Sequence, residues 1–92
     1  METIITYDIS GKHTEFKNEM KLLGYQDKVR GVKNCEWIHF PNTTLYHPSK
    51  NPSTARDEAI KICENLKIEF ERCFATTWNR DYWGAICGAK FL

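Results

Sequence analysis

The stretch IITYDIS, residues 4–10, decides the fold. Its β-branched and aromatic residues suit a pleated, half-buried strand. Neighbouring residues of a strand face opposite sides of the sheet, which predicts Ile5, Tyr7 and Ile9 toward the core and Ile4, Thr6 and Asp8 away from it. A carboxylate such as that of Asp8 is stable inside a protein only with a partner. The residues around this strand therefore decide what its carboxylate does.

Two amphipathic helices are predicted after this strand. In the first, Phe16, Met20 and Leu23 recur at the spacing of one helix face, and Gly24 is the expected stop. In the second, small and aliphatic residues recur at the same spacing, and they are Ala55, Ala59, Ile62 and Leu66. Each helix therefore has one face for a shared core.

Further strands are predicted over residues 35–40, 43–46 and 70–78. Pro41 and Asn42 separate the first two, which predicts a hairpin with a short turn. Residues 26–34 hold few apolar side chains and one glycine, so we expect a connection there. The apolar stretch at residues 81–92 predicts a short extra strand or a packed arm.

The order strand, helix, strand, strand, helix, strand predicts a ferredoxin-like βαββαβ sandwich, an α+β fold. A chain of 92 residues has apolar area for one core, so we expect a single domain over residues 1–92. In this fold a four-stranded antiparallel sheet carries both helices on one face. Alternation points Ile38, Phe40 and Leu45 toward the helices, and it points Trp37, His39, Thr44 and Tyr46 toward the open face. Such a face favours association, with a homodimer as the expected state.

Composition limits the partners and predicts the compartment. Thirteen basic and twelve acidic residues give a net charge of +1, which steers the chain toward neither nucleic acid nor membranes. No apolar run near residue 1 resembles a signal or membrane segment, so we expect a cytoplasmic protein with no membrane partner. The four cysteines lack the spacing of a zinc site or redox motif, and we expect small core residues at these positions. They are Cys35, Cys63, Cys73 and Cys87.

The segment TYDIS, residues 6–10, ends the first strand of a short chain with a ferredoxin-like pattern. In this it resembles the small nuclease family of the CRISPR adaptation complex and its relatives, the virulence-associated protein D ribonucleases. The stretch FPNTTLYHP, residues 40–48, is similar to the second hairpin of small proteins related to that family. Lys12 and His13 stand where the adaptation nucleases commonly have an arginine-rich helix start. The resemblance implies a homodimer in which the Asp8 carboxylates of both subunits meet and hold a metal ion.

Cleavage of a phosphodiester by such a site needs a divalent ion, with Mg²⁺ the expected one. This ion commonly takes one or two protein carboxylates and keeps several waters. Asp8 is the expected ligand and catalytic residue, with Ser10 or His13 assisting in proton transfer. Alternatively, Asp8 caps the first helix or braces the turn at Ser10 and Gly11, as aspartates often do. Both interpretations stay open at this point.

A local excess of basic residues between positions 12 and 33 favours contact with phosphate groups, although such clusters are also typical of a solvated face. Hydroxyl groups in the predicted turn can bond to phosphate or to their own backbone. The expected nucleic-acid-binding residues are Lys12, Lys17, Lys21, Lys28, Arg30, Thr43 and Thr44. Aromatic side chains can stack bases or pack in a core or dimer interface, and the candidates are Trp37, Tyr46, Trp78, Tyr82 and Trp83.

Two functions of different classes follow. The first is a homodimeric, Mg²⁺-dependent endonuclease acting on RNA or DNA. The alternative is a non-catalytic dimeric module that binds nucleic acid, a nucleotide or a protein partner through its open sheet face. The fold supports both, because one scaffold serves many functions. Arg80, in the stretch NRDYWG, can hold a phosphate or pair with Asp81 of a neighbouring subunit.

Overall fold

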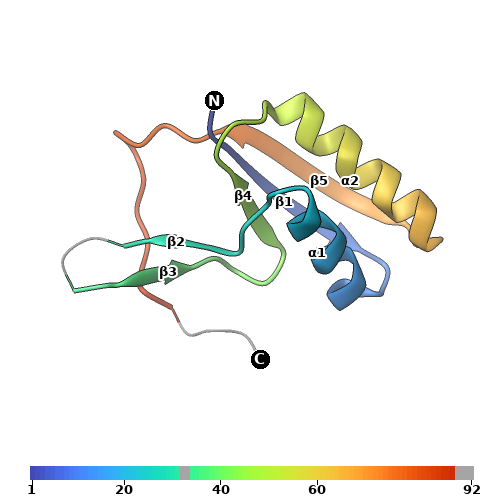
Figure 1. The fold of residues 1–92 in the computed structure, drawn as a ribbon, viewed down its shortest axis with the longest axis horizontal. Coiled ribbons are helices and arrows are strands. Elements are labelled where there is room, and N and C mark those ends of the chain that lie inside the picture. The colour runs from blue at the N-terminus through green and yellow to red at the C-terminus, as the bar shows by residue number, and fades with distance from the viewer. Residues whose placement is uncertain (32–33, 89–92) are drawn as a thin grey trace.

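The structure, a computed structural model, describes residues 1–31 and 34–88. The elements of these residues are β1 (Thr3–Ile9), α1 (His13–Leu22), β2 (Lys28–Arg30), β3 (Trp37–His39), β4 (Thr44–His47), α2 (Pro52–Leu66) and β5 (Phe70–Thr77) (Figure 1). The predicted α+β class is confirmed. Residues 78–88, here called the C-terminal arm, pack on the molecule without forming a strand. Positions 89–92 of the predicted extra strand or arm lie outside the described residues.

A three-stranded antiparallel sheet in the order β4-β1-β5 forms the centre of the molecule. β1 pairs with β4 on one edge and with β5 on the other, so Ile5 lies opposite both Leu45 and Ala75. The strand predicted over residues 35–40 does not join this sheet. After one bridge between Gln26 and Tyr46, with hydrogen bonds of 2.8 and 2.9 Å, the chain leaves the edge of β4. It then forms a separate two-stranded sheet from β2 and β3, here called the β2–β3 hairpin.

The hairpin predicted over residues 35–46 is wrong in its pairing, because β3 pairs with β2 and β4 pairs with β1. The amide of Phe40 donates to the carbonyl of Asp27 at 3.0 Å. Pro41 has no amide hydrogen with which to continue a ladder. The amide of Thr44 then donates to the carbonyl of Pro41, in a turn that leads the chain into β4. Residues 26–34, predicted as a connection, therefore contain β2, the strand that pairs with β3.

The helices cover one face of the three-stranded sheet, here called the inner face, which carries the main core. The predicted alternation of β1 is confirmed, because Ile5, Tyr7 and Ile9 are buried in this core. The helices contribute Phe16 and Met20 from α1 and Ala55, Ala59, Ile62 and Cys63 from α2. Leu23, predicted on the apolar face of the first helix, is 40% exposed because α1 ends at Leu22.

The opposite face of the sheet, here called the outer face, is covered in part by the chain itself. Ile4 and Tyr46, which lie opposite each other in β1 and β4, pack there with Val29 and Ile38 of the β2–β3 hairpin and with Trp78. Ile38 was expected to face the helices, and this prediction is wrong because the hairpin belongs to a second core on the outer side. Part of the apolar area that a partner was expected to cover is therefore already buried.

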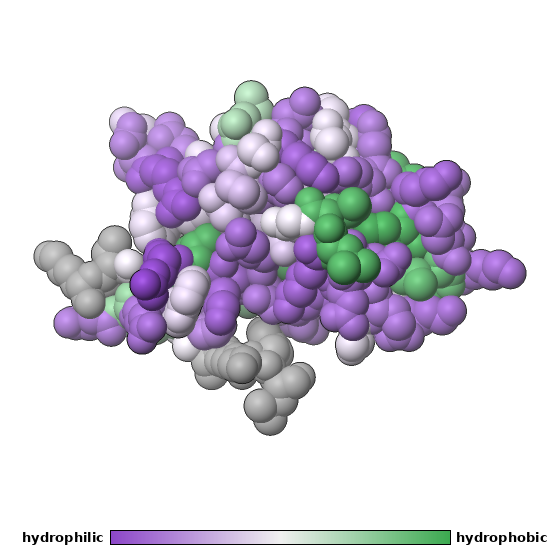
Figure 2. Space-filling model, viewed as in Figure 1, coloured by the Kyte–Doolittle hydropathy of each residue, from purple (hydrophilic) through white to green (hydrophobic). Residues whose placement is uncertain are grey.

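The rest of the outer face is open. Thr6 and Asp8 are exposed on β1, and Phe74, which lies opposite Thr6 on β5, is 67% exposed. The side of the molecule seen in Figure 2 is largely hydrophilic, with a hydrophobic area over the region of α1 and α2. On this side of the molecule, exposed apolar area therefore gathers over the two helices.

Replacing Gly24 with alanine should destabilise the fold. Gly24 has φ of 98°, and a Cβ there would lie 2.8 Å from Nε2 of the buried His47. Left-handed backbone costs a residue with a Cβ about 1–2 kcal/mol, so Gly24→Ala should lower the free energy of unfolding by at least about that much in urea titrations. Gly11→Ala is the matched control, because nothing lies within 4 Å of its Cβ position. Equal unfolding midpoints for the two variants would contradict this account of the turn.

Candidate ligand site on the outer face

Asp8 lies on the outer face, as the alternation predicts, but it already has a charged partner. Nε of Arg72, on the neighbouring strand β5, donates to Oδ2 of Asp8 at 2.7 Å. The Asp8 and Arg72 side chains are 51% and 74% exposed, and exposed ion pairs contribute little to stability. The alternative role as a helix cap is wrong, because the N-cap of α1 is Lys12 and no side chain caps this helix.

The two residues expected to assist Asp8 lie near it in sequence but take other roles or positions. Oγ of Ser10 accepts a hydrogen bond of 2.8 Å from the amide of Glu69, and the Ser10 amide donates to the Glu69 carbonyl at 3.1 Å. These bonds tie the end of β1 to the segment that leads into β5. His13 is the exposed first residue of α1. Within residues 1–31 and 34–88, no group of three or more His, Cys, Asp or Glu side chains is placed to hold a metal ion.

The cations predicted to bind nucleic acid are spread over α1 and β2, and each has a partner in the chain. Two form salt bridges, Lys21 with Asp27 at 3.0 Å and Arg30 with Glu36 at 3.5 Å. Nζ of Lys12 donates to the Leu66 carbonyl, and Nζ of Lys17 donates to Oδ1 of Asn42. Nζ of Lys28 lies 4.4 Å from the centre of the Trp37 ring. A phosphate group would have to compete with these contacts.

The two threonines predicted beside these cations shape the turn before β4. The carbonyl of Thr43 accepts a hydrogen bond of 3.0 Å from the amide of Tyr7, which joins this turn to β1. Thr44 is half-buried and lies at the edge of a cavity on the outer face. Backbone hydrogen bonds therefore hold this turn in place. Of the two threonines predicted to contact nucleic acid, Thr44 lines the cavity.

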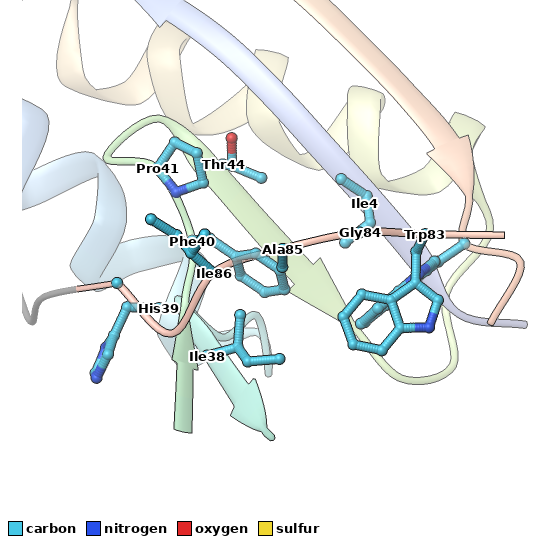
Figure 3. A pocket seen from close by; sticks show the side chains of 12 residues that line it. Ile4, Ile38, His39, Phe40, Pro41, Thr44, Trp83, Gly84, Ala85 and Ile86 are labelled. Carbon is cyan, nitrogen blue, oxygen red and sulfur yellow. The ribbon is translucent and has the colours of Figure 1, made fainter. Parts of the chain in front are cut away.

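The cavity has a volume of about 640 Å³ and lies between three segments of the chain. The sheet contributes Ile4, the β2–β3 hairpin contributes Ile38, and the C-terminal arm contributes Trp83, Ala85 and Ile86 (Figure 3). No Asp, Glu, Lys or Arg is among the described residues that line it. Small-molecule sites in proteins commonly have about 300–1,000 Å³ and an apolar lining. The size and chemistry of this cavity are therefore those of a small-ligand site.

His39 is the titratable side chain of the lining, and its ring points away from the apolar side chains around it (Figure 3). Its backbone joins two walls of the cavity, because the His39 amide donates to the carbonyl of Cys87 in the arm at 3.0 Å. The inside of the cavity is thus apolar. A ligand with a net charge would lose its hydration there without gaining a partner.

Aromatic rings form one end of the cavity. Trp78 packs edge-on against Tyr46 and against Trp83, with ring centres 5.5 Å apart in both pairs, and it lies 6.1 Å from Phe40. Edge-to-face contacts of this kind hold rings in fixed orientations. Tyr46, Trp78 and Trp83, predicted to stack bases or to pack in a core or dimer interface, therefore pack on one another. Trp83 stays 40% exposed at the cavity.

The near end of the C-terminal arm, where the arm leaves β5, is held by an ion pair between Arg80 and Glu2. Nε and Nη2 of Arg80 donate to the two carboxylate oxygens of Glu2 at 2.9 Å each, and the Arg80 guanidinium lies 3.6 Å from the centre of the Trp78 ring. The Tyr46 hydroxyl donates to the same carboxylate at 2.8 Å. The hydrogen bonds from Arg80 and Tyr46 lower the pKa of Glu2 to about 2. Arg80, predicted to hold a phosphate or to pair with Asp81 of a neighbouring subunit, therefore joins the arm to Glu2, the residue before β1.

The far end of the arm is held by a disulfide between Cys35, in the β2–β3 hairpin, and Cys87. The expectation of core cysteines is confirmed for Cys63, which is buried, and is wrong for this pair. A separation of 52 positions gives no local signal of pairing. A disulfide that closes such a loop typically stabilises a fold by about 2–4 kcal/mol. Burial raises the pKa of both remaining thiols, those of Cys63 and Cys73.

Comparison with known proteins gives no match, because no protein family, curated protein or solved structure corresponds to this chain. In the described part of the chain, neither α1 nor α2 has the length and apolar character needed to cross a membrane.

The Glu2 ion pair predicts how stability depends on pH. The folded protein holds the pKa of Glu2 at about 2, below its ordinary value of 4.5. Its contribution is therefore fully present above about pH 4.5 and is lost as the pH falls toward about 2. Between these values, Glu2→Gln should lose less thermal stability than the unaltered protein, measured as Tm in matched buffers. Parallel Tm profiles for the two proteins would contradict the assigned anchor.

Proposed function

We propose that this protein is a non-catalytic binding module whose ligand is an uncharged, largely apolar small molecule held in the outer-face cavity. The observation that carries the proposal is the cavity itself, about 640 Å³ in volume and without a charged side chain among the described residues that line it. Apolar burial supplies affinity in such a site at about 25 cal/mol per Å². The fixed aromatic rings supply shape, since their contacts with one another limit their movement.

This ligand class fits better than a nucleotide or a nucleic acid. Phosphate groups need cations, and Arg80, the one Lys or Arg among residues 78–88 of the arm, already binds Glu2 with two hydrogen bonds. The lysines and arginine predicted to bind phosphate lie on α1 and β2 with partners of their own. A neutral ligand leaves all of these contacts in place.

Titration with Nile red, an uncharged apolar dye, tests the proposal. We expect saturable binding with a rise in dye fluorescence. Trp83→Ala should raise the Kd about tenfold, because burial of a large apolar side chain is worth about 1.5 kcal/mol or more. Ile86→Ala, at the same wall of the cavity, should weaken binding in the same direction.

Two controls match these variants in chemistry but lie away from the cavity lining. Tyr82 precedes Trp83 and is 83% exposed, and Ile60 is a 39% exposed isoleucine of α2. Tyr82→Ala and Ile60→Ala should leave the Kd unchanged. If the controls weaken binding as much as the cavity variants, the dye reports on general surface hydrophobicity and the proposed site is wrong.

The resemblance supports a second candidate, a homodimeric Mg²⁺-dependent nuclease on a ferredoxin-like fold. The strand order β5-β1-β4, with Gln26 bridged to the far edge of β4, agrees with three strands of that sheet and a start of the fourth. The open part of the outer face, with Asp8 and Phe74 exposed, offers a place for a second copy and a carboxylate for a metal ion. Mg²⁺ would have to displace Arg72 from Asp8.

Asp8→Asn separates the two candidates. A metal-dependent nuclease should lose cleavage by orders of magnitude in this variant, because the ligand charge is gone. The pair with Arg72 is exposed, so its loss should change stability little, and Asp81→Asn, at an exposed aspartate of the arm, is the matched control. Cleavage that survives in Asp8→Asn or in excess chelator, or a monomer in light scattering, would end the nuclease candidate.

A further inference from the structure

We propose that the disulfide between Cys35 and Cys87 is a redox-controlled latch that closes the outer-face cavity when oxidised and opens it when reduced. The inference deepens the proposed function and rests on it where it concerns ligand binding. It starts from the position of the disulfide, which joins two of the three walls of the cavity.

The C-terminal arm crosses the outer face between two anchors, and its middle forms a wall of the cavity. At the near anchor the Trp78 amide donates to the Glu2 carbonyl at 3.0 Å, beside the Arg80 ion pair. At the far anchor are the disulfide and the hydrogen bond from the His39 amide to the Cys87 carbonyl. Residues 84–86, which line the cavity between the anchors, are exposed on the outside. The position of this wall therefore depends on both anchors of the arm.

Reduction would remove the covalent part of the far anchor. Among the described residues, the hydrogen bond between His39 and Cys87 and the close approach of Gly88 to His39 then remain to join the end of the arm to the hairpin. A single hydrogen bond has a small net worth, because water takes its place when it opens. The near anchor does not depend on the disulfide, so the arm would swing from Trp78 while the sheet and helices stay folded.

The disulfide is accessible to a reductant, and no other thiol of the described chain competes with it. Cys87 is exposed and Cys35 is half-buried, which directs attack to Sγ of Cys87. Burial raises the pKa of Cys63 and Cys73, so these two thiols are weak nucleophiles. The sequence predicts a cytoplasmic protein, and disulfides of that compartment are mostly transient or redox-sensing rather than structural.

The proposed reductant is a dithiol, such as a small reducing protein with two neighbouring cysteines. Its thiolate attacks Sγ of Cys87 and forms a mixed disulfide, and the Cys35 sulfur leaves as a thiolate that takes a proton. The second thiol of the reductant then attacks the mixed disulfide and releases Cys87, which takes the second proton. Two electrons and two protons reach this protein, and the dithiol becomes a disulfide.

The experiment compares the full chain in its oxidised form and after reduction with dithiothreitol, using two readouts. The first is cleavage by chymotrypsin after the exposed Tyr82 and Trp83, followed by mass spectrometry, and reduction should speed it about tenfold or more as the arm opens. The second is the Kd for Nile red, which should rise about tenfold because the cavity loses its preorganised wall. Reoxidation should reverse both changes.

Two variants serve as controls. The double variant Cys35→Ser and Cys87→Ser should behave as the reduced form with or without dithiothreitol. Cys73→Ser, which keeps the latch, should respond like the unaltered protein.

Equal cleavage of the arm in both redox states overturns the inference, and so does faster cleavage with an unchanged Kd. If the dye binds neither form while cleavage still depends on redox state, the proposed function fails and the latch stands as a control of the arm alone.

Discussion

The alternation of side chains along β1 is the constraint on which the rest of the structure depends. This strand lies at the centre of the three-stranded sheet and pairs along both edges, so each of its side chains must belong to one face or the other. Ile5 and Tyr7 place the helices on the inner face, and Ile4 begins the second core and the cavity on the outer face. One strand therefore supplies both the stability of the fold and a wall of the candidate site.

The outer site depends on contacts between parts of the chain that are far apart in sequence. Glu2 holds Arg80 across 78 positions, and Cys35 holds Cys87 across 52. Between these anchors the arm closes a cavity that neither the sheet nor the β2–β3 hairpin forms alone. The same anchors explain why the apolar residues of the arm can lie at the surface without a strand partner. The lining of the cavity is therefore apolar, whereas the arm that forms one wall is held by an ion pair at one end and by a disulfide at the other.

Local periodicity predicted the elements whose pattern of apolar residues lies within the element itself, namely β1, β5 and the apolar faces of Phe16 with Met20 and of Ala55 with Ala59. It failed for the hairpin, because β3 pairs with β2, whose residues have too few apolar side chains to be predicted as a strand. It placed Asp8 on the correct face but gave no sign of Arg72, which is 64 positions away. The disulfide had no signal for the same reason, since pairing over long separations depends on the finished fold.

We propose that the outer face of the sheet, and not the face covered by the helices, binds a ligand. Amide chemical shifts of the isotope-labelled, oxidised chain during titration with Nile red test it residue by residue. We expect saturable shifts at cavity residues such as Ile4, Ile38 and Ile86, with the amides of α1 and α2 unmoved. Shifts confined to the helices, or to the open part of the outer face around Phe74, would contradict the account.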